Sequence, residues 1–262
     1  MKNFKPFEQS ERIAFTLAEV LITLGIIGVV AALTIPSLVA KYQEKQTVTA
    51  LKKFYSTFSQ AYIMAKNENG TPDTWYGGEM GEGIGPDIML DIIIRYLKVS
   101  KICHGDTGCF ADEVYKKIDG KTTSNWNTHK HISKFITADG MNVFVHSYGS
   151  KPQNIGGGSL KDSYGAVAVD INGFKKPNSH GKDMFTFIIT KDGVIPYGTS
   201  DSTHTKMLED GTLDTVSAFP NACNINDCRN SCEGCTAWVI YNENMDYLHC
   251  DDLSWEGKHS CK

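Results

Sequence analysis

Residues 14–36 read AFTLAEVLITLGIIGVVAALTIP, and this stretch determines the first element of the chain. From Val20 to Ala40 no residue is charged, and about 20 apolar residues at 1.5 Å per residue suffice to cross a hydrocarbon core about 30 Å thick. The stretch therefore predicts one membrane-spanning helix. Its single carboxylate, Glu19, lies near the start. A charge inside hydrocarbon costs at least roughly 2.5 kcal/mol, so Glu19 indicates a function with a partner.

A polar segment, MKNFKPFEQSERIA, precedes the apolar run and ends at the small residue Ala14. A secretory signal peptide would place its small-residue cleavage site after the apolar run. Here the small residue comes first, so a cut after Ala14 would leave the helix attached and create a new amino terminus at Phe15. That amine would lie about one helical turn from Glu19.

The sequence Phe15-Thr16-Leu17-Ala18-Glu19 resembles the start of mature type IV pilins and type II secretion pseudopilins. In that family a prepilin peptidase removes the leader and N-methylates the new terminal phenylalanine. The resemblance covers residues 14–70, and Gly25, Gly28 and Pro36 stand where many members carry helix-weakening residues. Members usually have glycine before the cut, whereas this chain has Ala14, which keeps a small side chain.

The resemblance implies a domain plan. Residues 1–14 would be the cleaved leader, 15–40 the transmembrane or filament-core half of a long helix, 41–70 its amphipathic half, and 71–262 a disulfide-rich globular head. In the family arrangement Glu19 would pair with the Phe15 amine of a neighbouring subunit. Losing one member of such a buried ion pair costs roughly 3 to 5 kcal/mol, because the other charge is left alone, so Glu19 would set the register of assembly.

The resemblance also implies partners and a location. The partners are the same and other pilin-like subunits, the prepilin peptidase, an assembly platform in the inner membrane and the lipid bilayer. The protein would cross the inner membrane once, with its head outside the cytoplasm, and then join a periplasmic or cell-surface filament. A motility or adhesive pilus, a secretion pseudopilus and a competence filament all remain open.

Beyond the span a helical period continues. The apolar positions fall three and four residues apart, at Val48, Leu51, Tyr55, Phe58, Tyr62 and Ala65. Asn69-Gly70 followed by Pro72 predicts the end of the helix. A helix from about Thr16 to Asn69 would be roughly 80 Å long, with an apolar first half and an amphipathic second half.

The remaining sequence predicts an α+β head with a small antiparallel sheet lying on the helix. Gly85-Pro86-Asp87 indicates a helix that reaches about Lys98. Alternating apolar residues predict strands, and Lys191-Asp192-Gly193 a hairpin turn. The expected strands include Met141 to His146, Val167 to Ile171 and Phe185 to Ile189. Residues 150–160 are expected to form a loop, and 236–248 a strand or a helix.

All eight cysteines follow the predicted span, at Cys103, Cys109, Cys223, Cys228, Cys232, Cys235, Cys250 and Cys261. An even number on an exported domain favours disulfides. Proximity pairs Cys103 with Cys109 and Cys250 with Cys261. The middle four leave two alternatives open, disulfides or a tetrahedral zinc site, of which disulfides fit an oxidising compartment better.

The glycine-rich segment 169–185 gathers four residues with oxygen ligands: Asp170, Asn172, Asn178 and Asp183. Such ligands suit Ca²⁺, and the segment loosely resembles a calcium-binding turn of some pseudopilin heads. The alternative is that these side chains cap their own turn. We therefore assign no cofactor to the chain, and Ca²⁺ bound in the head is a hypothesis.

We predict no enzymatic activity and no catalytic residue. His129 and His131 lie in a polar stretch, and no nucleophile or phosphate-binding motif occurs. The formal net charge is −4 without a basic cluster in the head, which argues against nucleic acid as the main partner. The competing interpretation is a membrane-tethered, disulfide-rich binding domain that does not polymerise.

Overall fold

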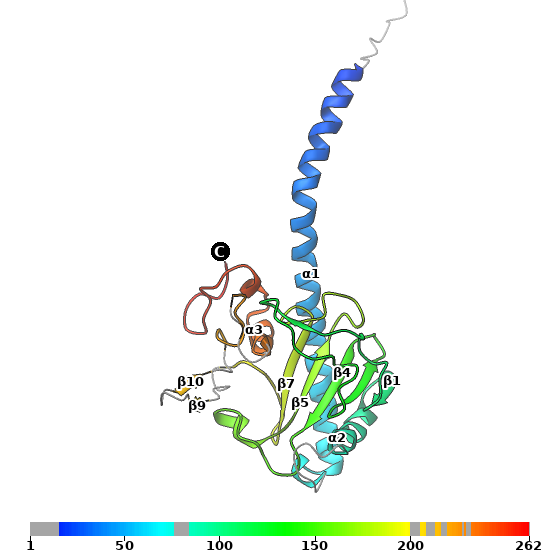
Figure 1. The fold of residues 1–262 in the computed structure, drawn as a ribbon, viewed down its shortest axis with the longest axis vertical. Helices are drawn as coiled ribbons and strands as arrows, with labels where there is room; N and C mark the ends of the chain where they lie inside the picture. Colours follow the sequence, from blue (N-terminus) through cyan, green and yellow to red (C-terminus); the bar gives the residue numbers. More distant parts are fainter. Residues whose placement is uncertain are drawn as a thin grey trace, which may run out of the picture. The chain divides into compact units, whose positions relative to one another are not determined.

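The computed structural model of the 262-residue chain describes residues 16–75, 84–199, 205–207, 213–215, 219–226, 228 and 232–261. The chain divides into two compact units, residues 1–43 and 44–262, which are described separately. The second unit is the head. Figure 1 shows its elements along the sequence.

Helix α1 (Leu17–Asn69) supplies the described part of the first unit and continues into the head. Almost every residue in 17–43 is exposed, including the large apolar ones. The helix continues through Pro36, and two hydroxyl groups nearby, those of Thr34 and Ser37, donate to the carbonyls of Val30 and Thr34 at 2.9 Å. Side chains thus stay bonded to the helix backbone around the proline.

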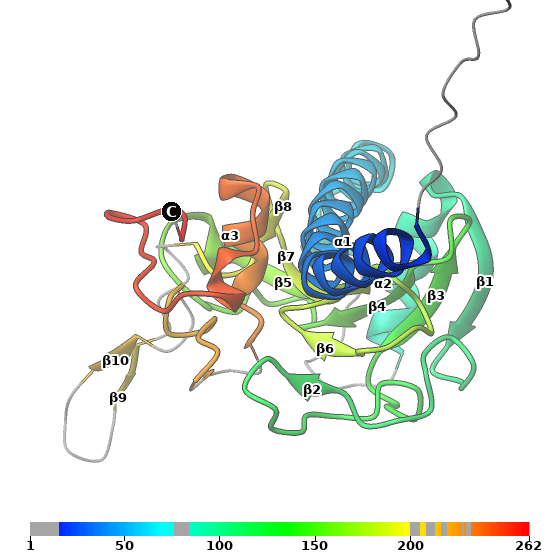
Figure 2. The same ribbon diagram turned by 90° about the horizontal axis from the view of Figure 1, so that it is seen from above.

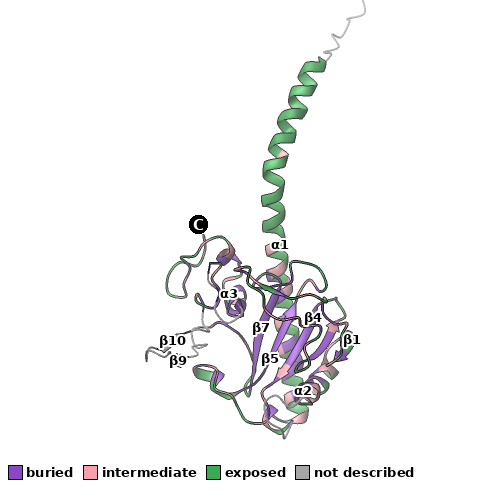
Figure 3. Ribbon diagram, viewed as in Figure 1, coloured by how far each residue is buried: buried purple, intermediate pink, exposed green. Residues whose placement is uncertain are grey.

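The part of α1 that belongs to the head packs one face against a sheet, as its period predicts. Its buried residues are Val48, Leu51, Phe54, Phe58, Ala61, Tyr62 and Ala65. Tyr55 is half-buried and stacks on Phe187 with ring centroids 5.2 Å apart. The hydroxyl group of Tyr62 donates to the carbonyl of Thr190. Figure 3 shows this contrast between the exposed start of α1 and the buried strands.

The sheet has eight strands, in the order β1-β3-β4-β5-β7-β6-β2, with β8 also paired to β7. Their bounds are β1 Val99–His104, β2 Lys116–Lys117, β3 Ser133–Thr137, β4 Asn142–Ser147, β5 Ser163–Asp170, β6 Ser179–His180, β7 Met184–Thr190 and β8 Val194–Pro196. A separate pair joins β9 (Thr205–Met207) to β10 (Leu213–Thr215). The α+β class is confirmed, but the sheet is larger than expected and mixed, because β6 runs parallel to both β2 and β7.

The two faces of the sheet have different covers. The face under α1 presents Val143, Val145, Val167, Val169, Phe185, Phe187 and Ile189. The opposite face packs Phe144, Ala168 and Met184 against Phe110 and Tyr115. Period-2 alternation along β4, β5 and β7 produces this division. The core therefore contains two apolar layers, and the loops that cross the second layer bring polar groups to one end of the sheet.

The remaining elements differ from expectation in detail. Helix α2 is Gly85–Ile93 and is followed by a 3-10 turn, η2 (Ile94–Tyr96), so it ends before Lys98 because β1 begins at Val99. Short 3-10 turns also form at η1 (Pro72–Thr74) and at η3 (Gly158–Asp162), where the expected loop ends. Residue Ile171 lies just beyond the end of β5.

The segment expected as strand or helix is helical. It forms α3 (Cys235–Asn242) and the 3-10 turn η5 (Asp246–Leu248). Trp238 of α3 is fully buried and stacks on Phe219 with ring centroids 4.0 Å apart. The main-chain N–H of Thr186 donates to the hydroxyl of Thr236 at 2.9 Å. Figure 2 shows α3 beside β7 and β8, at the same edge as the C-terminal loop.

Candidate functional site

Glu19 takes part in a capping box at the start of α1. The main-chain N–H and the hydroxyl of Thr16 both donate to Glu19 Oε2 at 2.8 Å, and the N–H of Glu19 donates to Thr16 Oγ1 at 3.2 Å. These reciprocal bonds satisfy two donors that a helix start leaves open. The carboxylate therefore has a local partner within its own chain, which the interpretation of Glu19 as a membrane charge missed. The Thr-x-x-Glu spacing was the available signal.

The structure describes only some of the other residues of the proposed assembly segment. Ala14 and Phe15 lie outside the described residues. Gly25 and Gly28 both lie on α1, and a Cβ added at either would meet nothing within 4 Å. In the described part of the chain one helix, α1, is long and apolar enough to cross a membrane, with a peak mean hydropathy of 2.3 and none of that window buried.

The four proposed calcium ligands come together at the connection between β5 and β7, residues 171–183, which includes β6 and is called the β5–β7 turn below. Asp170 ends β5, and Asp183 immediately precedes β7; both are buried. The N–H groups of Asn178 and Ser179 donate to Asp183 at 2.8 and 2.6 Å, and the side-chain amide of Asn172 donates to it at 3.0 Å. The turn-capping alternative is thus present in the geometry.

The electrostatics of this turn leave room for a cation. Burial, followed by repulsion from Asp183, raises the pKa of Asp170 to about 8. Burial also raises the pKa of Asp183 to about 6 against the hydrogen bonds from Ser179 and Asn178. Among the described residues, the side-chain oxygens of Asn172 and Asn178 are buried without a hydrogen-bond partner. Two carboxylates beside two unused amide oxygens are the donors that Ca²⁺ prefers.

The acidic side chains at this turn are too few to hold a metal ion by themselves. No group of three or more His, Cys, Asp or Glu side chains in the described ranges is placed to hold a metal ion. A calcium ion would therefore depend on amide or main-chain oxygens in addition to Asp170 and Asp183. Calcium binding stays a prediction.

Two neighbours of this turn were missed from the sequence. The hydroxyl group of Tyr115 donates to Asp170 Oδ2 at 2.7 Å, and burial raises the pKa of Tyr115, which keeps it a donor. Glu113 accepts from the side-chain amide of Asn178. Both residues are more than fifty positions from the turn along the chain, so no local pattern connected them with it.

The eight cysteines form four disulfides in the head. The two pairs expected from proximity, Cys103–Cys109 and Cys250–Cys261, are confirmed. The middle four pair as Cys223–Cys235 and Cys228–Cys232. Because these sulfurs are bonded to each other, they offer no thiolate to a zinc ion.

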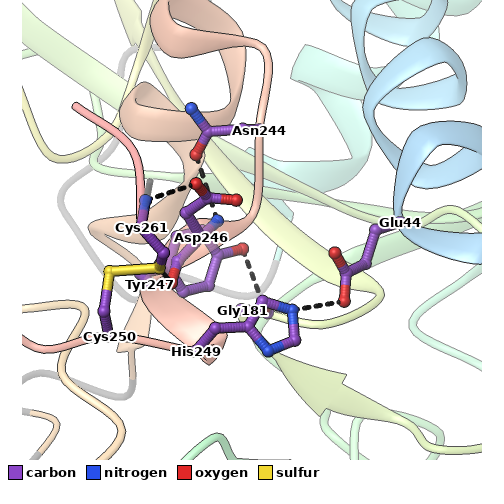
Figure 4. Close-up of polar contacts among 8 residues, drawn as sticks. All are labelled: Glu44, Gly181, Asn244, Asp246, Tyr247, His249, Cys250 and Cys261. Atoms are coloured by element: carbon purple, nitrogen blue, oxygen red, sulfur yellow. Dashed lines mark hydrogen bonds and ion pairs between the residues drawn. A yellow bond between two sulfur atoms is a disulfide. The ribbon is translucent and has the colours of Figure 1, made fainter. Parts of the chain in front are cut away.

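The C-terminal loop is attached at several points near the start of the head. Figure 4 shows the Tyr247 hydroxyl donating to the carbonyl of Gly181 at 2.7 Å and His249 Nε2 lying 2.8 Å from Glu44 Oε1. Asp246 accepts from the N–H of Cys261 at 2.7 Å, next to the Cys250–Cys261 disulfide. The last described residues are therefore held to the β5–β7 turn and to α1.

The two histidines considered for catalysis lie beside aromatic residues. His129 packs against Trp126 with ring centroids 5.5 Å apart, and His131 lies 5.9 Å from His129. The N–H of His131 donates to His129 Nδ1 at 3.3 Å, and burial lowers the pKa of His129. His129 is half-buried and His131 is exposed.

A cavity of about 440 Å³ lies in the head between α1 and the β3–β4 turn. Phe54, Phe58, Leu97 and Met141 supply much of its apolar lining. At its edge Lys53 Nζ lies 2.8 Å from Asp139 Oδ2. The cavity suits an apolar group better than a polar substrate.

In the comparison with known proteins, a family of unknown function, DUF6613, matches residues 37–91. The matched segment contains the amphipathic part of α1 and residues 85–91 of α2, but not residues 14–19. No curated protein matches the chain. No solved structure matches it.

Proposed function

We propose that this chain is a structural subunit of a type IV pilus-like or type II secretion pseudopilus filament. The observation that carries the proposal is the division of α1. Its first residues are apolar and exposed on all sides, whereas its continuation buries one face in a disulfide-linked α+β head. An apolar helix that its own chain leaves uncovered needs a bilayer or neighbouring helices around it.

In this proposal a prepilin peptidase cuts after Ala14 and N-methylates Phe15. Before assembly the subunit crosses the inner membrane once with its head outside the cytoplasm, where the four disulfides are stable. An assembly platform then moves it into a filament, in which Glu19 faces the Phe15 amine of a neighbour. No catalytic activity and no nucleic-acid partner are included in the proposed role.

A second function, a membrane-tethered binding domain that never polymerises, is favoured by one observation. Glu19 already has hydrogen-bond partners in Thr16 of its own chain. A carboxylate with a local partner needs no neighbouring subunit. The two proposals therefore differ in whether Glu19 has a second role.

The test is intact mass and N-terminal sequencing of the protein from its native membrane, together with its detection in a sheared extracellular filament fraction. A mature protein that begins at N-methyl-Phe15 and appears in the filament fraction supports the filament subunit. An uncut protein that begins at Met1 and stays in the membrane supports the tether. Replacing Ala14 with a bulky residue should block the cut.

A further inference from the structure

The turn between β5 and β7 presents an aromatic residue beside two cations. Phe174 is 53% exposed, and Lys175 and Lys176 are exposed as well. Lys176 Nζ lies 3.5 Å from Glu113 Oε2, whereas Lys175 has no acidic partner in the part of the chain that the structure describes. An exposed ring next to cations fits a partner with apolar and anionic groups.

This turn lies at the end of the head that contains Glu44. The loop that bonds Gly181 through Tyr247 also reaches Glu44 through His249. The opposite end of β7 is fixed to a later part of α1, since Lys66 Nζ donates to the carbonyl of Lys191 at 3.3 Å. The β5–β7 turn is thus at the end of the sheet nearer to Glu44, and the opposite end lies nearer to Lys66.

The base of the turn is hydrogen-bonded and closely packed. Asp183 accepts hydrogen bonds from the turn backbone, and Gly173 has a φ of +70°, with the carbonyl oxygen of Gly140 2.5 Å from where a Cβ would stand. The β5–β7 turn therefore packs against the β3–β4 turn. Phe174 and the two lysines therefore lie between a glycine that packs against Gly140 and a backbone segment that is hydrogen-bonded to Asp183.

The covalent spacing brings this end of the head close to a membrane. Only residues 41–43 separate the uncharged run that ends at Ala40 from Glu44, and at 1.5 Å per residue they span roughly 5 Å. If residues 17–40 cross the bilayer, the end of the head at Glu44 is held within reach of the phospholipid headgroups. Lys45, on the first turn of the head, is also exposed.

We propose that Phe174, Lys175 and Lys176 contact anionic lipid headgroups of the bilayer that anchors the subunit before assembly. The Phe174 ring lies among the glycerol and upper acyl groups, and the two ammonium groups bind phosphates. A neighbouring subunit is the main alternative occupant. Lipid is favoured because only residues 41–43 separate the uncharged run from this end of the head, whereas a neighbouring subunit must first arrive. The inference rests on the proposed membrane anchoring.

The experiment uses the full chain in nanodiscs, one set made of phosphatidylcholine and one of phosphatidylcholine with phosphatidylglycerol. Hydrogen–deuterium exchange is followed at residues 171–177. We expect slower exchange in the anionic nanodiscs, by about fivefold for each lysine that contributes, and loss of this effect at high salt. The double variant Lys175→Gln with Lys176→Gln should lose it. The matched control, Lys161→Gln with Lys191→Gln, removes two charges from the far end of the sheet and should keep it.

The outcomes separate the possibilities. Equal exchange in both lipids, or equal protection in the double variant and its control, overturns the lipid contact. Protection that instead rises with the number of subunits per nanodisc, at fixed lipid composition, assigns the turn to a neighbouring subunit and also overturns it. Failure of the protein to remain with the lipid after alkaline extraction would reject the membrane anchor itself, which distinguishes that failure from failure of the turn contact.

Discussion

In residues 17–43 the apolar side chains of Leu24 and Ile27 are 60% and 63% exposed, whereas in the head Phe58 and Phe187 are almost fully buried. The carboxylates of the two units also differ in exposure. Glu19 lies exposed in the first unit and is bonded to its own helix start, whereas Asp170 and Asp183 are buried in the head. The head thus completes its own core. The described part of the first unit has an apolar surface that the described residues of the chain leave uncovered.

Two substitutions at Glu19 test whether the first unit is completed by a neighbour. Glu19→Ala removes both the charge and the capping acceptor, whereas Glu19→Gln keeps a capping oxygen and removes only the charge. If Glu19 pairs with the Phe15 amine, both variants should fail to assemble, because the amine is left buried alone at a cost of roughly 3 to 5 kcal/mol per subunit.

The measurement is incorporation of each variant into sheared filaments beside wild type at equal membrane abundance. If Glu19→Gln is incorporated normally and only Glu19→Ala is impaired, the role of Glu19 is the helix cap, which is worth about 1 kcal/mol. Normal incorporation of both variants would remove Glu19 from assembly.

Truncating one apolar residue in each unit tests the contrast in burial. Phe58→Ala should lower the free energy of unfolding of the head by about 3 to 5 kcal/mol, because a large buried ring leaves a cavity. Leu24→Ala should change it by less than about 0.5 kcal/mol. Denaturant unfolding of the full chain in micelles, followed by near-ultraviolet circular dichroism, measures both. Equal losses would show that the head does not fold independently of the first unit.

Calcium should stabilise the head and not the first unit. If Asp170 and Asp183 share an ion, the folded state gains about 2.7 kcal/mol when free calcium is about 100 times the Kd. The melting temperature of the full chain in micelles is compared in millimolar calcium and in chelator. Asp183→Asn, which keeps an oxygen for the turn, should abolish the gain, and Asp192→Asn at the far hairpin should keep it. If the melting temperature of the wild type is the same in calcium and in chelator, Asp170 and Asp183 only cap the turn.

The stability of the calcium-free head should also depend on pH. The pKa values of Asp170 and Asp183 in the folded state, about 8 and about 6, lie above the ordinary aspartate value of 3.8. The folded state therefore holds more protons, and stability that is fully present below about pH 4 is lost as the pH rises through about 6 and toward 8. Unfolding in chelator between pH 4.5 and 8 measures the slope. The same slope in Asp170→Asn would contradict this assignment.

Some elements were predictable because their signals are long or repeated. Helix α1 repeats its apolar period over many turns, and β5 and β7 alternate cleanly. Strand β1 was not predicted because most of its residues are exposed or half-buried, so its sequence has no apolar alternation. Strand β3 escaped because it contains Lys134, a buried residue whose ammonium group donates to three main-chain carbonyls. Strands β2 and β6, of two residues each, are too short for any period.

The candidate sites divide in the same way. Asp170, Asn172, Asn178 and Asp183 are close in sequence, so their gathering at one turn was predictable. Tyr115 and Glu113 reach that turn only through the fold. The disulfides between near neighbours followed from proximity, whereas the pairing of Cys223 with Cys235, which encloses the Cys228–Cys232 bridge, is decided by where α3 begins.

The capping box of Thr16 and Glu19 also bears on what the proposed cleavage leaves behind. In the sequence, the bond between Ala14 and Phe15 precedes both Thr16 and the first residue of α1, Leu17. Every residue that takes part in the hydrogen bonds of the box therefore stays in the mature subunit. In the proposed maturation the subunit loses its leader and keeps the cap of its first helix.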